Sequence, residues 1–193
     1  MRSAIDRHRM TYQDLLALPD DGLRHELIDG EHFVTPAPVS RHQIILGNLY
    51  RLIGVHTHTT KCGVTLFAPY DIVFTNYDVV EPDLMYFSSA RYAAVVTEKN
   101  AQGPPDFVVE ILSPGTRRRD EGLKRRLYER MRVDEYWIVD PATESVRIHR
   151  LVNERYHETR LTRGTSGALQ TPLLSGLELS LDDVFEMPQA SAG

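Results

Sequence analysis

The segment 106–128 places one carboxylate inside an apolar strand and one lysine on the helix that follows. The strand, FVVEIL at 107–112, is apolar at every position except Glu110. Ionised carboxylates are rare in such runs unless they are paired with a cation or bound to a metal. Because side chains alternate along a strand, Glu110 shares one face with Val108 and Leu112. Glu110 is therefore either a structural irregularity or part of a site.

The lysine lies on a predicted helix that spans 117–131, with Thr116 as its expected cap. At about 100° per residue, Lys124 falls inside the arc of the helix that carries its apolar side chains, whereas most of its arginines fall outside. We therefore expect the amine of Lys124 to face the strand that carries Glu110. The alternative is a lysine whose stem passes the edge of the helix and leaves the ammonium in solvent.

A second carboxylate, Asp83, directly follows a proline at the start of another apolar run, LMYF at 84–87. Two neighbouring carboxylates repel each other, and a hard divalent cation such as Mg²⁺ relieves that repulsion with the help of water and phosphate oxygens. A lysine beside them orients or helps to deprotonate a water molecule and stabilises charge on a phosphate. Together Asp83, Glu110 and Lys124 contain the parts needed for metal-dependent hydrolysis of a phosphodiester.

Composition restricts the class of protein. The 193 residues fit one domain with a sizeable core, and the 41% hydrophobic and 25% charged fractions are ordinary for a soluble globular protein. The net charge of −5 gives no overall basic field, so any contact with nucleic acid needs a local basic patch. The best candidate patch consists of Arg117, Arg118, Arg119, Arg125, Arg126, Arg130 and Arg132. The alternative interpretation of this patch is a helix face that is simply solvated.

Cysteine usage and hydropathy predict the compartment. Cys62 is the single cysteine, so no disulfide forms within the chain. The first ten residues are polar, unlike a secretory signal, and no apolar run approaches the length of a membrane span. We expect a cytoplasmic protein with no membrane partner.

The order of expected elements indicates a mixed α/β fold with one central sheet flanked by helices. Helices are predicted at 11–18, at 40–57 with Ser40 as cap, and at 181–185, and a short one is possible at 90–97. Asp29-Gly30 predicts a tight hairpin between strands 24–28 and 31–35. Further strands are expected at 64–67, 72–74, 135–139, 145–151 and 155–161, and near residue 177. We expect one domain over 1–193, with 1–10 and 187–193 as loose ends.

These residues together resemble the Uma2 (DUF820) family of the PD-(D/E)XK nuclease superfamily. The resemblance covers roughly residues 11–186. The matching strings are HELIDGE at 25–31, PAP at 36–38 with RHQ at 41–43, EPDL at 81–84, DFVVEILSP at 106–114, Lys124, Tyr128 and YWIVDP at 136–141.

The resemblance implies a restriction-endonuclease-like central mixed sheet and a metal site. Asp83 is then the motif aspartate and Glu110 the motif acid, and the main-chain carbonyl of Ile111 is a further metal ligand. Leu112 stands where the superfamily usually has lysine, and Lys124 supplies the amine from the neighbouring helix, as is typical of this family. The implied cofactor is Mg²⁺, with Mn²⁺ as a substitute, and the implied partner is DNA.

Other polar residues have two interpretations each. Glu26 is either a third acid near the metal or a surface residue of the hairpin. His42 either contacts phosphate or acts as a second base, although an exposed or hydrogen-bonded structural histidine is the simpler reading. Arg117, Arg118 and Arg125 are candidate contacts for nucleic acid. The loops at 36–43 and 88–104 are left to determine specificity.

Three functions are compatible with the sequence. The leading hypothesis is a Mg²⁺-dependent endonuclease acting on DNA. The second is a module with a nuclease-like fold that binds nucleic acid or a protein partner without cutting. The third is a structural role as a homodimer, formed through an exposed sheet edge among strands 136–161.

Overall fold

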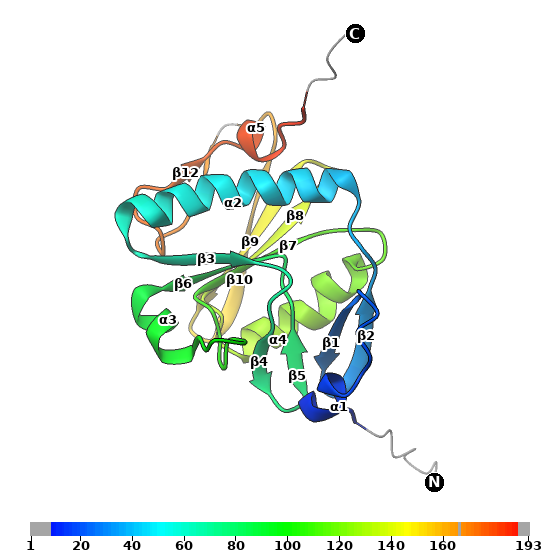
Figure 1. Ribbon diagram of the computed structural model, residues 1–193. Helices are drawn as coiled ribbons and strands as arrows, with labels where there is room; N and C mark the ends of the chain where they lie inside the picture. The colour runs from blue at the N-terminus through cyan, green and yellow to red at the C-terminus, as the bar shows by residue number, and fades with distance from the viewer. Residues whose placement is uncertain (1–8, 166, 189–193) are drawn as a thin grey trace.

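The computed structural model describes residues 9–165 and 167–188 as a mixed α/β domain (Figure 1). Its main sheet has the strand order β10-β9-β8-β7-β6-β3. Strands β7 and β8 pair in parallel, and the other pairs of this sheet are antiparallel. The bounds are β3 (Gly63–Phe67), β6 (Leu84–Ser88), β7 (Phe107–Ile111), β8 (Glu135–Asp140), β9 (Ser145–Val152) and β10 (Arg155–Thr162).

A second, smaller sheet carries the N-terminal hairpin and has the order β2-β1-β5-β4. Its strands are β1 (Arg24–Ile28), β2 (Glu31–Thr35), β4 (Ile72–Thr75) and β5 (Asp78–Val80). The hairpin has the predicted bounds, because Asp29 and Gly30 adopt the positive φ angles of 53° and 77° that a two-residue turn requires. A short pair, β11 (Leu169–Gln170) and β12 (Glu178–Leu179), completes the strands.

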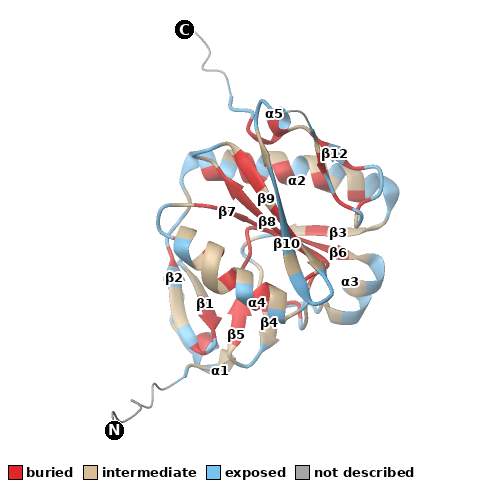
Figure 2. Cartoon of the chain, turned by 180° about the vertical axis from the view of Figure 1, so that it is seen from behind, coloured by how far each residue is buried: buried red, intermediate tan, exposed pale blue. Residues whose placement is uncertain are grey.

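Helices cover both faces of the main sheet (Figure 1). Helix α2 (Ser40–Thr60) and α5 (Leu181–Val184) lie on one face, and the π-helix η1 (Arg119–Lys124) and α4 (Arg125–Arg130) lie on the other. The remaining helices are α1 (Tyr12–Leu16) and α3 (Ser89–Val95). Coverage on both sides explains why β7 and β8 read as continuous apolar runs, and both strands are buried along their whole length (Figure 2).

Alternation along β7 sends successive side chains into two separate cores. Phe107, Val109 and Ile111 pack on the α2 side, together with Trp137 of β8. Val108 packs on the α4 side. Glu110 therefore points toward η1 and α4, as the strand period predicts.

The C-terminal hairpin shows which strand of the range 136–161 lies at the sheet edge. Strand β8 lies inside the sheet, and its aromatic residues Tyr136 and Trp137 are fully buried core residues. Of the strands in 136–161, only β10 is at an edge. The predicted homodimer stays a prediction, with β10 as the strand available for pairing.

One helix start differs from the expectation. Val39, not Ser40, occupies the cap position of α2, and it makes no side-chain cap. The helix expected over 117–131 begins at residue 117, directly after Thr116, and continues through η1 and α4. The carbonyl of Thr116 accepts hydrogen bonds from the N–H groups of Arg119 and Asp120, and its hydroxyl bonds to Ser113. π-Helical turns occur frequently at functional sites, and this one ends at Lys124.

The chain ends are only partly described. Met10 donates its N–H to the carbonyl of Gly30, and Arg9 bonds to the carbonyl of Asp29, so this part of the expected loose N-terminus is attached to the hairpin turn. Residues 1–8 and 189–193, which complete the two expected loose ends, lie outside the described residues. Over the described ranges, every helix is too short or too polar to traverse a lipid bilayer.

His149 of β9 is a buried base in the α4-side core. Its ring stacks on Tyr136 at 5.7 Å and also contacts Tyr156. Burial lowers the pKa of His149 to about 4, despite the nearby carboxylate of Glu158. An unfolded histidine has a pKa of about 6.5. Between these two values the unfolded chain binds a proton that the folded chain does not bind.

We therefore predict that the free energy of unfolding falls as pH drops from about 6.5 to 4, with about 2 kcal/mol due to His149 after allowance for screening. Replacing His149→Phe should remove this contribution, because the aromatic packing remains and the titrating group is lost. Urea denaturation at a series of pH values measures it. The exposed His157 gives the control, His157→Gln, which should follow the parent protein. An unchanged pH slope in His149→Phe would contradict the prediction.

Candidate active site

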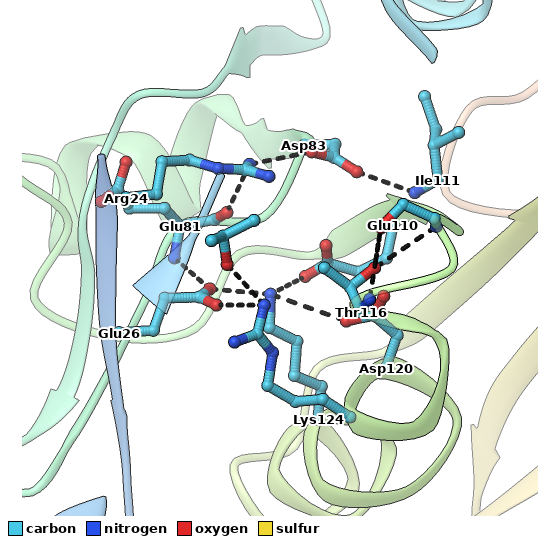
Figure 3. A network of polar contacts seen from close by, with 12 residues as sticks. Arg24, Glu26, Glu81, Asp83, Glu110, Ile111, Thr116, Asp120 and Lys124 are labelled. Carbon is cyan, nitrogen blue, oxygen red and sulfur yellow. Dashed lines mark hydrogen bonds and ion pairs between the residues drawn. The ribbon is translucent and has the colours of Figure 1, made fainter. Parts of the chain in front are cut away.

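Lys124 lies at the centre of a buried network of charged side chains (Figure 3). Its Nζ atom is 2.8 Å from Oε1 of Glu110 and 2.7 Å from Oε1 of Glu26, and the residue is 2% exposed. The sequence prediction that this amine faces Glu110 is confirmed, and the alternative of a solvent-exposed ammonium is wrong. Burial opposes the charged form, but the two carboxylates outweigh it and raise the pKa of Lys124.

Glu110 is held in the middle of β7 with 3% of its surface exposed. Its Oε1 atom accepts hydrogen bonds from Lys124 and from the hydroxyl of Tyr128, both at 2.8 Å. Burial raises the pKa of Glu110 to about 8. The charge of Lys124 lowers this pKa, but three other nearby carboxylates raise it and oppose the effect of the lysine. Among the described residues, none donates a hydrogen bond to its other oxygen, Oε2.

Asp83 immediately precedes β6 and is held from three sides. Oδ1 accepts from Arg24 at 2.9 Å, while Oδ2 accepts from Nε2 of His42 at 3.0 Å and from the backbone N–H of Ile111 at 2.8 Å. Burial opposes ionisation here, but the hydrogen bond from His42 and the charge of Arg24 outweigh it and lower the pKa of Asp83 to about 2. The bond from Ile111 links Asp83 directly to the end of the strand that carries Glu110.

His42 lies in the first turn of α2 and is buried. The sequence favoured an exposed or hydrogen-bonded structural histidine, and the hydrogen-bonded form is confirmed by the contact with Asp83. Its other nitrogen, Nδ1, is buried and has no hydrogen-bond partner among residues 9–165 and 167–188.

Glu26 is not a surface residue of the hairpin. It is 1% exposed, and its Oε1 atom forms the ion pair with Lys124 and accepts a hydrogen bond from the backbone N–H of Glu81 at 2.9 Å. The guanidinium of Arg119 lies 3.4 Å from its other oxygen. Of the two readings of the sequence, only the one that brings Glu26 close to the other acids agrees with this placement.

Several members of the network were missed at the level of sequence. Asp120, in the first turn of η1, is 1% exposed and lies 4.0 Å from Lys124. The available signal was its spacing of four residues from Lys124, which favours the same helix face. Tyr128 follows Lys124 by four residues, so the same spacing rule places it on that helix face. Arg24 alternates with Glu26 along β1, so a period of two predicts that they share a face.

A cavity of about 520 Å³ opens above the network. Asp83, Glu110 and Lys124 contribute to its wall, and three loops at 36–39, 112–117 and 141–142 surround them. This volume is within the usual range for sites that bind small molecules. Of the expected specificity loops, 36–43 contributes to the lining of this cavity and 88–104 does not.

The candidate contacts for nucleic acid are divided by the fold. Arg117 lines the cavity, but both of its terminal nitrogens bond to Asp140, at 2.9 and 3.0 Å. Asp140 also stabilises the turn after β8, since it accepts a hydrogen bond from the N–H of Ala142. Arg118 and Arg125 are not among the residues that line the cavity. The charge of Arg125 acts on His149 of β9, away from the network.

Acids outnumber bases in the network. The buried carboxyl groups are Glu26, Glu81, Asp83, Glu110 and Asp120, and the basic side chains that contact members of this set are Arg24, His42, Arg119 and Lys124. Burial, with the charge of Asp71 and Glu26, raises the pKa of Glu81 to about 7. The described part of the site thus has more carboxyl groups than cationic groups, and the raised pKa of Glu81 and of Glu110 shows that their ionisation is opposed.

The mixed sheet with helices on both faces, and a lysine held between acids from two strands, define a domain with a restriction-endonuclease-like, nuclease-type fold. The chain belongs to the Uma2 family, whose model carries the description "Putative restriction endonuclease" and matches residues 12–182.

One solved structure supports the fold. It is described as a putative nuclease belonging to DUF820 from Anabaena variabilis ATCC 29413. The two proteins are 19% identical, the match covers 91% of this chain and 97% of that chain, and the TM-score is 0.77. No curated protein matches the chain. The family and the fold predicted from the sequence are confirmed.

We predict that Lys124→Met lowers the free energy of unfolding by about 3–5 kcal/mol, because it leaves Glu26 and Glu110 buried without their shared cation. Urea denaturation at pH 8 measures the loss. Arg126, which is exposed on the same helix, supplies the matched variant Arg126→Met, and that change should cost less than about 0.5 kcal/mol. Equal losses in the two variants would show that the central ion pair contributes nothing to stability.

Proposed function

We propose that this protein is an endonuclease that hydrolyses phosphodiester bonds in DNA with the help of Mg²⁺ or Mn²⁺. The observation that supports the proposal is the convergence of Asp83, Glu110 and Lys124 on the wall of one cavity. They come from three separate elements of the chain, and they supply two oxygen-ligand carboxylates and one ammonium.

The residues present fit a hard divalent cation. The surplus of buried carboxylates favours added positive charge, and Oε2 of Glu110 has no hydrogen-bond donor in the described part of the chain. No group of three or more His, Cys, Asp or Glu residues within that part is arranged to hold a metal. Mg²⁺ needs only one or two carboxylates, since water and phosphate oxygens complete its shell.

The residues that would hold the cation are Asp83, Glu110 and the main-chain carbonyl of Ile111. When bound, the cation supplies Lewis-acid chemistry, which polarises the phosphate and makes water a better nucleophile at neutral pH.

The remaining groups of the site position Asp83 and the ammonium of Lys124, and the ammonium stabilises charge on the phosphate. Arg24 and His42 fix the orientation of Asp83, because each donates to a different oxygen of its carboxylate. Lys124 is held between two carboxylates, so it presents an ammonium that orients the attacking water and stabilises charge on the phosphate. Glu26 assists by keeping that ammonium in place.

A second candidate function has a specific observation in its favour. Both oxygens of Asp83 already accept hydrogen bonds from groups of the protein itself, and Glu110 is paired with Lys124. A network neutralised in this way suits a module that binds nucleic acid or a protein partner without cutting. The same experiment separates the two candidates.

The purified protein should cleave DNA with Mg²⁺ or Mn²⁺ and not with excess EDTA. Asp83→Asn, Glu110→Gln and Lys124→Met should each lower the rate on the order of 100- to 1,000-fold, the usual cost of losing a group that stabilises the transition state. Gel assays with circular and linear DNA, double- and single-stranded, measure the rate at fixed protein concentration.

Arg126→Ala is the control for this assay, since Arg126 is exposed and does not line the cavity. Circular dichroism and thermal melting verify that each variant is folded. DNA binding that persists in Asp83→Asn, without cleavage by the parent protein under either metal, would establish the non-cleaving alternative.

A further inference from the structure

A second cavity, of about 440 Å³, lies next to the active-site cavity. The two cavities share part of their walls, and the shared residues are Arg24, Thr35, Pro36, Ala37, Pro38, His42 and Asp83. Asp83, with its partners Arg24 and His42, therefore borders both spaces. When one group of a ligand binds at Asp83 in the first cavity, the adjacent group of the same ligand is within reach of the second cavity.

The wall of the second cavity includes an exposed aromatic ring. Phe67, the last residue of β3, is 47% exposed, and its ring packs edge-on against Tyr50 at 4.7 Å between ring centroids. Leu23 and Leu46 add apolar surface to the same wall. This surface is matched to a flat apolar ligand, because a nucleobase gains stability when it stacks on an aromatic side chain.

The charges around the second cavity disfavour a phosphate. Its charged lining residues are Asp20, Arg24, Glu81 and Asp83, and the guanidinium of Arg24 is already paired with Asp83. Acids thus predominate in the lining, so a neutral group is favoured over an anion. Gln43, which is exposed at this cavity, supplies an amide that both donates and accepts hydrogen bonds.

Basic side chains that line the active-site cavity are already paired with carboxylates, so few of them remain to bind a long phosphate backbone. Arg41 pairs with Glu144, Arg117 with Asp140, and Arg119 with Glu26. Duplex recognition depends on many contacts between basic side chains and phosphates. These pairs leave the wall of the cavity poorly suited to follow both strands of a duplex.

We propose that the second cavity binds the nucleobase next to the phosphate at Asp83, with Phe67 as its stacking platform. This rests on the proposed function, since it assumes that a phosphodiester occupies the first cavity. A base that is paired and stacked inside a duplex does not reach such a cavity unless its nucleotide is extruded. The substrate class is therefore nucleic acid with unpaired nucleotides, such as a single strand, a flap or a bulge.

The test measures binding separately from cleavage. Fluorescence anisotropy with Ca²⁺ in place of Mg²⁺ compares a labelled single strand of about 12 nucleotides with the matched blunt duplex and with the same strand made abasic. The parent protein should bind the single strand more tightly than the other two. Phe67→Ala should weaken binding of the single strand about 5- to 100-fold and leave binding of the abasic strand unchanged.

Tyr92→Ala is the matched control, because Tyr92 is also an exposed aromatic residue (40%) and lines neither cavity. Its binding should equal that of the parent protein. Quenching of a 2-aminopurine base in the strand, present in the parent and lost in Phe67→Ala, reports stacking directly. Thermal melting verifies that the variants are folded.

The outcomes separate the base cavity from the nuclease. A Phe67 effect on binding without any cleavage would support the base cavity and overturn the proposed hydrolysis. Cleavage by the parent, together with equal binding of single strand, abasic strand and duplex in parent and Phe67→Ala, would overturn the base cavity and leave the nuclease in place.

Discussion

The ammonium of Lys124, held between Glu110 of the main sheet and Glu26 of the smaller sheet, is the interaction on which the rest of the site depends. Each carboxylate alone would be costly to bury, and one shared cation reduces that cost for both. It also joins three elements that are distant in the chain, β1, β7 and η1. The arrangement of the two sheets and the arrangement of the site therefore depend on the same contact.

The excess of acids has consequences for both stability and chemistry. A network with more carboxylates than bases is costly to bury, and burial raises the pKa of Glu81 and Glu110 to about 7 and about 8. Such perturbed groups cluster at functional sites, where stability is lost in exchange for reactivity. A network made only to stabilise the fold would be better served by apolar residues of similar volume.

The fold separates groups that the sequence places together. The arginines of 117–132 look like one basic patch in the sequence, but Arg117 lines the cavity above the Lys124 network, whereas Arg125 does not line it and its charge acts on His149. Charge runs are therefore poor guides to a binding surface when they lie on a helix. The apolar wall around Phe67 is better evidence for a ligand, because an exposed aromatic ring in a cavity has a definite physical preference for a stacked partner.

The sequence by itself determined the local geometry. Periods of two and of 3.6 residues were enough to point Glu110 and Lys124 at each other, and Asp29-Gly30 was enough to fix the hairpin, because these depend only on neighbouring residues. The tertiary structure alone decided which groups surround Asp83, that Glu26 is buried, and that η1 is a π-helix. Those features depend on how the two sheets and α2 pack against each other, and contacts between residues so far apart in the chain leave no periodic signal in it.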